Sequence, residues 1–208
     1  MSFFRSPARI LLGLVAAVAL VTYVYAPTEI TSNLRNMASG DSSNPISGLS
    51  VTLEQVKGAS PPTVKATVKN NNDRPVSVLT YNSPLESLAI PLGFVQVTPE
   101  GAKEPLDLAG LQIRRMWPPV RDDITEIAAG GSASAELPFN PMAVPPEKMG
   151  KKNTVQVVGE WMAVYDVPKK DITDEMLDKT PRGGNTYMGD YKSEKIDFIV
   201  DEGSEELK

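Results

Sequence analysis

The sequence has 208 residues, with 21 basic and 26 acidic side chains and a formal net charge of −5, and it contains neither histidine nor cysteine. This acidic balance argues against a nucleic-acid partner, because nucleic-acid binding relies on a basic surface. Without histidine and cysteine, the chain cannot build the usual zinc and copper sites, a Ser-His-Asp or Cys-His catalytic group, or a disulfide. The chain also has no D-x-D-x-D-G calcium loop, no P-loop and no G-x-G-x-x-G, so we expect no metal and no cofactor.

Residues 1–26 are predicted to be an export segment. Arg5 and Arg9 precede an uncharged and mostly apolar run of 17 residues, 10–26. This length lies between the core of a signal peptide and a membrane-spanning helix, so two outcomes stay open. A cleaved signal peptide would make the protein secreted. A retained signal anchor would hold the domain in the lumen or outside the cell, with the membrane contacted only through this segment.

Residues 27–46 are rich in Ser, Asn, Gly and Pro and are predicted to be a flexible linker. The folded domain is expected over residues 47–202, and an acidic tail over residues 203–208.

Residues 49–81 have the clearest strand pattern in the chain. Apolar side chains alternate with polar ones in three short runs, which predicts three strands with one buried face each. The apolar members are Leu49, Val51 and Leu53, then Val64, Ala66 and Val68, then Val76 and Val78.

Residues 82–108 are predicted to contain one helical turn and one hairpin. Ser83, Pro84 and Glu86 have the spacing of a capping box with proline in the first turn, which predicts a single helical turn over 84–88. Residues 93–97 are predicted to be a strand, and residues 104–108 its hairpin partner.

The last third of the chain is predicted to be mainly strand and loop. Strands are expected over 133–139, 153–167 and 195–201, with loops over 141–152 and 181–191 and a short helix over 171–179. In the longest of these strands one face is expected to carry Val155, Val157, Trp161, Ala163 and Tyr165, with Trp161 in the core. About seven or eight strands with one or two short helices predict an all-β fold, an immunoglobulin-like antiparallel β-sandwich.

Two groups of side chains are candidates for protein binding, because aromatic and arginine residues are over-represented at interface hot spots. The first is Arg114, Arg115, Trp117 and Arg121, within residues 111–123. The alternative is that Trp117 covers one end of the core while the arginines pair with Asp122 and Asp123.

The second group is Tyr187, Met188 and Tyr191, within the glycine-rich loop. The alternative is that these side chains fold back over the edge of the sheet.

The order of strands and turns over residues 48–140 resembles the propeptide of fungal deuterolysin-type zinc metalloproteases. The matching stretches are 49–53, 63–70, 75–79, 82–85 and 93–97, with a strand on each side of Gly130-Gly131. The resemblance implies a role in folding or occluding a protease. Protease activity itself does not carry over, since the chain has no histidine for a His-Glu-x-x-His helix.

These observations predict a non-catalytic, secreted or lumenal β-sandwich that binds a protein. The resemblance makes a protease the expected partner, with the domain acting as a propeptide-like inhibitor or chaperone. Two alternatives stay open: a structural or host-interaction secreted protein, and a carboxylate-dependent glycan hydrolase, for which two acidic side chains would suffice.

Overall fold

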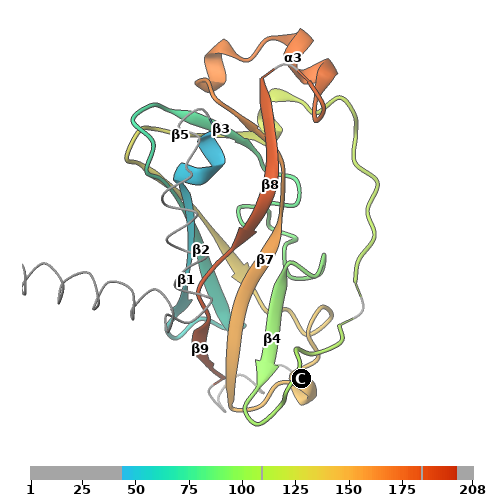
Figure 1. Ribbon diagram of the computed structural model, residues 1–208. Helices are drawn as coiled ribbons and strands as arrows, with labels where there is room; N and C mark the ends of the chain where they lie inside the picture. The colour runs from blue at the N-terminus through green and yellow to red at the C-terminus, as the bar shows by residue number, and fades with distance from the viewer. Residues whose placement is uncertain (1–43, 109, 184, 201–208) are drawn as a thin grey trace, which may run out of the picture. The chain divides into compact units, whose positions relative to one another are not determined.

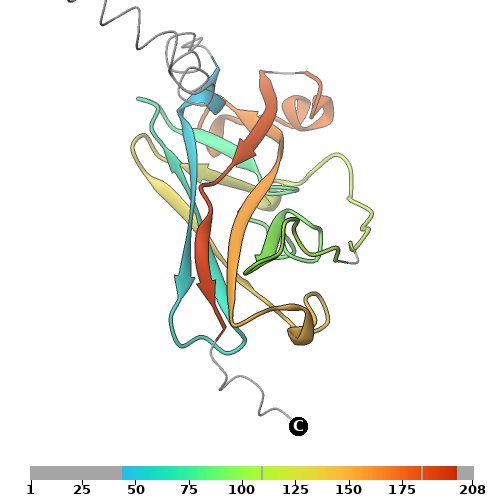
Figure 2. The ribbon, with the colours of Figure 1, turned by 60° about the horizontal axis from the view of Figure 1, so that its bottom comes forward.

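The computed structural model describes residues 44–108, 110–183 and 185–200, and these form a two-sheet β-sandwich (Figures 1 and 2). The predicted export segment, most of the linker and the acidic tail lie outside the described residues. Nine antiparallel strands are present within the described residues, so the predicted all-β sandwich is confirmed.

The first sheet has three strands in the order β1-β2-β6: β1 (Leu49–Val56), β2 (Thr63–Asn70) and β6 (Ser132–Pro138). The predicted alternation determines its buried face, because Val51 pairs with Val68 and Leu53 pairs with Ala66. All four side chains are buried.

The second sheet is built on β7 (Lys152–Tyr165), the longest strand, with 14 residues. Its first half pairs with β4 (Val95–Pro99) and β9 (Ile196–Ile199), and its second half pairs with β3 (Val76–Leu79) and β8 (Thr186–Lys192). The short strand β5 (Ile124–Ile127) extends the sheet beyond β3. Because β7 has strand neighbours on both edges near each of its ends, it is the central strand of the sheet.

The main core lies between the two sheets. Trp161 is 1% exposed there, as predicted, and its ring packs on that of Tyr191 with 4.7 Å between centroids. Phe139 and Phe198 make a second ring contact at 4.8 Å.

A β-bulge in β7 corrects the predicted face of this strand. The pairing with β8 shifts between Trp161 and Val164, so one extra residue is accommodated on β7. Trp161 and Val164 therefore both face the main core, whereas Ala163 and Tyr165 face the other side of the sheet.

A second, smaller core covers that other side of the sheet. It contains Leu79, Tyr81, Ile124, Ala163, Tyr165, Ile172 and Leu177. Residues 167–180 close over it, through the 3₁₀ turn η4 (Lys169–Asp171) and the helix α3 (Asp174–Lys179). Thr173 caps α3 by accepting the N–H of Met176 at 3.2 Å, so the helix predicted over 171–179 is present but starts three residues later.

Three local predictions are wrong. Residues 84–88 form turns rather than a helical turn, and residues 104–108 form no strand, although Leu106 N–H donates to Val97 O at 2.7 Å. The predicted loop 181–191 contains most of β8. The remaining short elements are the 3₁₀ turns η1 (Pro45–Gly48), η2 (Arg121–Asp123) and η3 (Pro146–Lys148).

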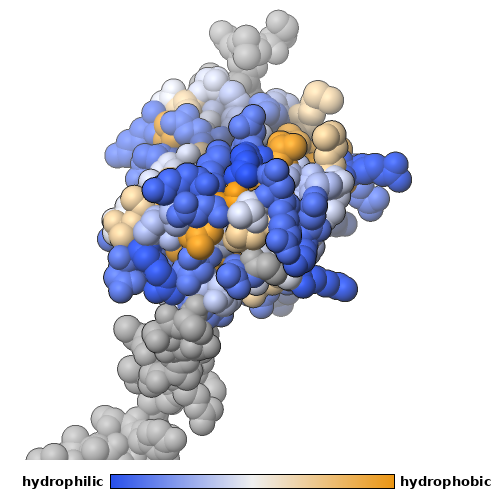
Figure 3. Space-filling view, turned by 90° about the horizontal axis from the view of Figure 1, so that it is seen from above, coloured by the Kyte–Doolittle hydropathy of each residue, from blue (hydrophilic) through white to orange (hydrophobic). Residues whose placement is uncertain are grey.

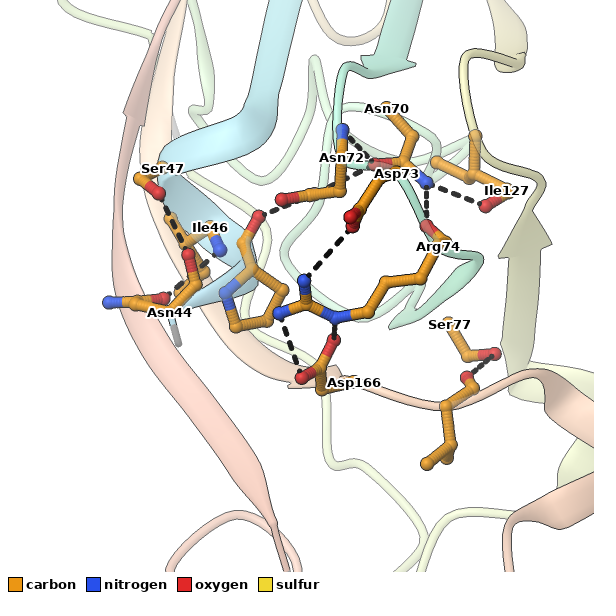
Figure 4. A network of polar contacts seen from close by, with 12 residues as sticks. Asn44, Ile46, Ser47, Asn70, Asn72, Asp73, Arg74, Ser77, Ile127 and Asp166 are labelled. Atoms are coloured by element: carbon orange, nitrogen blue, oxygen red, sulfur yellow. Dashed lines mark hydrogen bonds and ion pairs between the residues drawn. The ribbon is translucent and has the colours of Figure 1, made fainter. Parts of the chain in front are cut away.

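Polar contacts fix the start of the domain against the turn between β2 and β3 (Figure 4). The amide of Asn70, which is fully buried, donates to the carbonyls of Arg74, Ile127 and Ala128 at 2.9–3.1 Å. Its oxygen accepts from Asn72, whose own amide donates to Pro45 O at 3.0 Å.

Two further contacts connect distant strands. The Arg74 guanidinium forms two hydrogen bonds, of 2.6 and 3.0 Å, to the carboxylate of Asp166 just after β7. At the other end of the sandwich, the Gln55 amide pairs with the backbone of Ile199 through both its nitrogen and its oxygen, at 2.6 and 2.9 Å. Gln55 thereby bonds the backbone N–H and C=O of Ile199 on the edge of β9 that faces away from β7.

Candidate protein-binding surface

The segment 111–123 is attached to the turns that follow β3 through Arg115. The Arg115 guanidinium forms an ion pair with Glu86 and lies 4.5 Å from the centroid of the Tyr81 ring. The Glu86 carboxylate also accepts the N–H of Asn82 at 2.7 Å, rather than that of Ser83 as the predicted capping box requires. Glu86 is only 8% exposed, so its contacts with Arg115 and Asn82 compensate for the burial of its charge.

Trp117 is held by its indole N–H and is partly exposed. Its indole N–H donates to the carbonyl of Thr180 at 3.0 Å, and its ring lies 6.4 Å from that of Tyr81. The side chain nevertheless remains 42% exposed. Trp117 therefore covers the end of the second core, in agreement with the alternative interpretation, and still offers apolar surface.

Arg121 joins the same segment to the 167–180 insertion. Its guanidinium donates to the carbonyl of Ile172 and forms an ion pair of 2.9 Å with Asp174. Arg115 and Arg121 thus pair with Glu86 and Asp174, which are distant in the sequence, and not with Asp122 and Asp123. Arg114 is exposed, and no ion pair joins it to any other described residue.

Tyr81 lies beneath this segment as a neutral hydrogen-bond donor. Its hydroxyl donates to Asp123 at 2.6 Å. Burial, followed by this hydrogen bond, raises the pKa of Tyr81 to about 12. The phenol therefore stays protonated at neutral pH and keeps Asp123 in place.

Most of the exposed large hydrophobic side chains belong to this region. Eight are found among the described residues, and five of them lie on residues 88–120: Leu88, Leu111, Met116, Trp117 and Val120, called the apolar surface below. The segment that carries Leu88 and the segment 111–120 are joined by a 2.6 Å hydrogen bond from Leu111 N–H to Pro91 O. Met116 is 73% exposed. Figure 3, which looks onto the end that carries α3, shows hydrophobic side chains as separate patches among hydrophilic ones.

The second predicted group does not form a contact patch. Tyr191 is 5% exposed, packs on Trp161, and donates its hydroxyl to Asn82 O at 2.6 Å, and burial raises its pKa. Tyr187 is half-buried against the main core. Only Met188, at 43%, is exposed. Strand β8 places Tyr187 and Tyr191 inward, because they are four residues apart and share one face.

Sequence reasoning missed Leu88, Leu111 and Val120 as surface residues. They stand in segments with no periodic pattern, so alternation gives no information on which side they face. Within residues 44–200, as far as they are described, no group of three acidic side chains is placed to hold a metal ion. No helix in that part of the chain is both long enough and apolar enough to cross a membrane.

Comparison with known proteins gives a family and one relative. A family model for an immunoglobulin-like domain matches residues 48–200. An uncharacterized secreted protein of Arthroderma benhamiae is 32% identical over 160 residues, which cover 73% of this chain and 79% of that protein. The solved structure of a Northeast Structural Genomics Consortium target is 9% identical, with a TM-score of 0.28, and the match covers 77% of this chain and 90% of that one.

Proposed function

The chain belongs to the family of immunoglobulin-like domains, and we propose that it is a binding module whose apolar surface docks a partner protein. Like its relative in Arthroderma benhamiae, the protein is secreted. The observation that carries the proposal is the placement of five exposed large hydrophobic side chains on two adjoining segments. Exposed hydrophobic patches that polar residues surround mark protein interaction sites.

The contacts beneath the apolar surface favour binding. Arg115, Trp117 and Arg121 tie the segment 111–123 to residues 81–86 and 167–180, so the exposed side chains are held before a partner arrives. Holding a loop in its bound conformation lowers the entropy lost on association. Tryptophan and arginine are also the residue types found most often at binding hot spots.

The partner we propose is a protease, with the domain acting as a propeptide-like inhibitor or chaperone. Support comes from the order of strands over residues 48–140, which resembles a protease propeptide. The mechanism is steric: the segment 111–123 lies across the partner and covers its cleft without being cleaved. No catalytic role is assigned to the domain itself.

The test mixes the purified protein with a deuterolysin-type metalloprotease and measures binding and inhibition. We expect a complex with a dissociation constant of about 1 μM or tighter, which corresponds to about −8 kcal/mol. Met116→Asp should weaken it by at least about tenfold, because a charge is then buried against an apolar partner surface. Met142→Asp is the matched control, since Met142 is fully exposed and lies outside the apolar surface.

Absence of a complex at micromolar concentration would remove the protease as the partner. A different secreted partner whose binding is lost with Met116→Asp and kept with Met142→Asp would favour the host-interaction alternative. Equal binding by both variants to every partner would contradict the proposed surface.

A further inference from the structure

Several loops lie at the end of the sandwich opposite α3 (Figures 1 and 2). Residues of these loops line a pocket of about 530 Å³. This volume lies within the range of about 300–1,000 Å³ that small-molecule sites occupy. Its walls come from the turn between β1 and β2, from the loop after β6, and from the residue after β9. The lining includes four prolines, Pro61, Pro62, Pro141 and Pro146, together with Phe139 and Met149.

Backbone hydrogen bonds hold these walls together. Phe139 N–H donates to Pro62 O at 2.8 Å, which joins two of the three segments. Within the loop, Val144 N–H donates to Asn140 O at 2.9 Å, and Val200 N–H donates to Lys151 O at 2.9 Å. Since proline fixes its own φ angle, a wall with four prolines has little freedom to collapse. The pocket is therefore preformed.

The floor of the pocket is apolar. Phe139 and Val144 are 3% and 1% exposed, and the Phe139 ring packs on Phe198 in the main core. No lysine, arginine, aspartate or glutamate contributes to the lining. A charged ligand would lose its hydration here and gain no counter-ion.

Two polar side chains complete the lining. Ser60 and Asn140 are both exposed, and neither side chain is bonded to another described residue. Their hydroxyl and amide are thus available to one polar group of a ligand. A pocket with apolar walls and a few polar groups that fix orientation is the usual form of a small-molecule site.

We propose that this pocket binds an uncharged lipid with an apolar body and a single hydroxyl or carbonyl group. The body would lie on Phe139 and Val144, and the polar group would reach Ser60 or Asn140. The chain's own residues 201–208 are poorly suited to the pocket, because four of these eight residues are acidic. The site is separate from the apolar surface, so the proposal does not depend on the protein partner.

The test uses the neutral fluorescent probe N-phenyl-1-naphthylamine with the full-length purified protein. We expect saturable binding at micromolar concentration, with displacement by dodecanol or by cholesterol. The two competitors distinguish a chain-like from a ring-like lipid. Dodecanoate at neutral pH should displace the probe at least about tenfold less well than dodecanol, because its charge finds no partner in the lining.

Two neighbouring residues supply a matched pair of variants. Pro141 is exposed and lines the pocket, whereas Met142 is fully exposed and does not line it. Pro141→Glu should weaken probe binding by at least about tenfold, and Met142→Glu should leave it unchanged. Met149→Glu, at a half-buried lining position, is a second variant, with thermal unfolding as the check on folding.

Three results would overturn the proposal. One is the absence of saturable probe binding by the folded protein. Another is equal binding by folded Pro141→Glu and Met142→Glu. The third is displacement by dodecanoate as effective as that by dodecanol, since the pocket would then accept a charge.

Discussion

Glu86 shows how one buried charge can fix the course of two segments. Its carboxylate binds the Arg115 guanidinium and accepts the N–H of Asn82, while only 8% of the residue is exposed. Glu86→Gln keeps the shape of the side chain and removes its charge, which leaves Arg115 without a counter-ion in a mostly buried position. We expect the free energy of unfolding to fall by about 1–3 kcal/mol, measured by urea denaturation.

The control for this change is another glutamate in an ion pair. Glu175 pairs with Lys179 one helical turn away at 2.6 Å, and both side chains are largely exposed. Because solvent screens such a pair, Glu175→Gln should leave the urea midpoint nearly unchanged. Equal effects of Glu86→Gln and Glu175→Gln would show that the Arg115 contact does not stabilise the fold.

Contacts between residues that are distant in the sequence decide where the predicted protein-binding side chains lie. Trp117 reaches Thr180 across 63 positions and Arg115 reaches Glu86 across 29. Local spacing marks both residues as unusual, but it gives no partner for Trp117 and offers Asp122 and Asp123, rather than Glu86, for the arginines. The neighbouring glycines predict a loop at Tyr191, whereas the alternation of Tyr187, Gly189 and Tyr191 is a strand pattern.

At the scale of the element, β7 depends on one glycine and one bulge. The side chain of Tyr191 lies over β7 at Gly159. A Cβ on Gly159 would lie 2.4 Å from the hydroxyl oxygen of Tyr191. Gly159→Ala therefore has to displace the Tyr191 ring from Trp161 and break its bond to Asn82. We expect a loss of about 1–3 kcal/mol in the free energy of unfolding, as for other overpacked cores.

A double-mutant cycle tests whether the clash with the Tyr191 ring causes this loss. If the Tyr191 ring is the obstacle, Gly159→Ala should cost much less in a Tyr191→Ala background than in the wild type, and the two effects should be non-additive. Gly110→Ala is the control, because no atom lies within 4 Å of the added Cβ. Additive effects would place the strain elsewhere in β7.

The strands were predictable where alternation runs without interruption, as in β1, β2 and β6. The bulge in β7 was not predictable. An added residue reverses which side chains face the core, and the amino-acid composition does not show where it is added. The prediction of a helical turn over 84–88 is wrong for a different reason. The Glu86 carboxylate that should have capped it reaches Asn82 N–H and Arg115 instead, so tertiary contacts override the local signal.

At the scale of the whole molecule, two cores stabilise one sheet from both sides, and each contains buried tyrosines. Tyr81 and Tyr165 lie in the second core and Tyr191 lies in the main core. Burial raises the pKa of all three, that of Tyr81 to about 12. In the unfolded chain the same hydroxyls should titrate near the ordinary value of about 10.

This difference predicts that the protein loses stability in alkali. A group whose pKa is higher in the folded state holds its proton more tightly there, so its contribution is complete below pH 10 and declines as pH rises towards the folded pKa. We expect the free energy of unfolding to fall between pH 10 and 12, with tyrosinate absorbance appearing as the protein unfolds. Tyr81→Phe should be less stable at neutral pH, because it loses the hydrogen bond to Asp123, and should show a shallower alkaline decline. The same decline in wild type and Tyr81→Phe would show that the pKa of Tyr81 is no higher in the folded protein than in the unfolded chain.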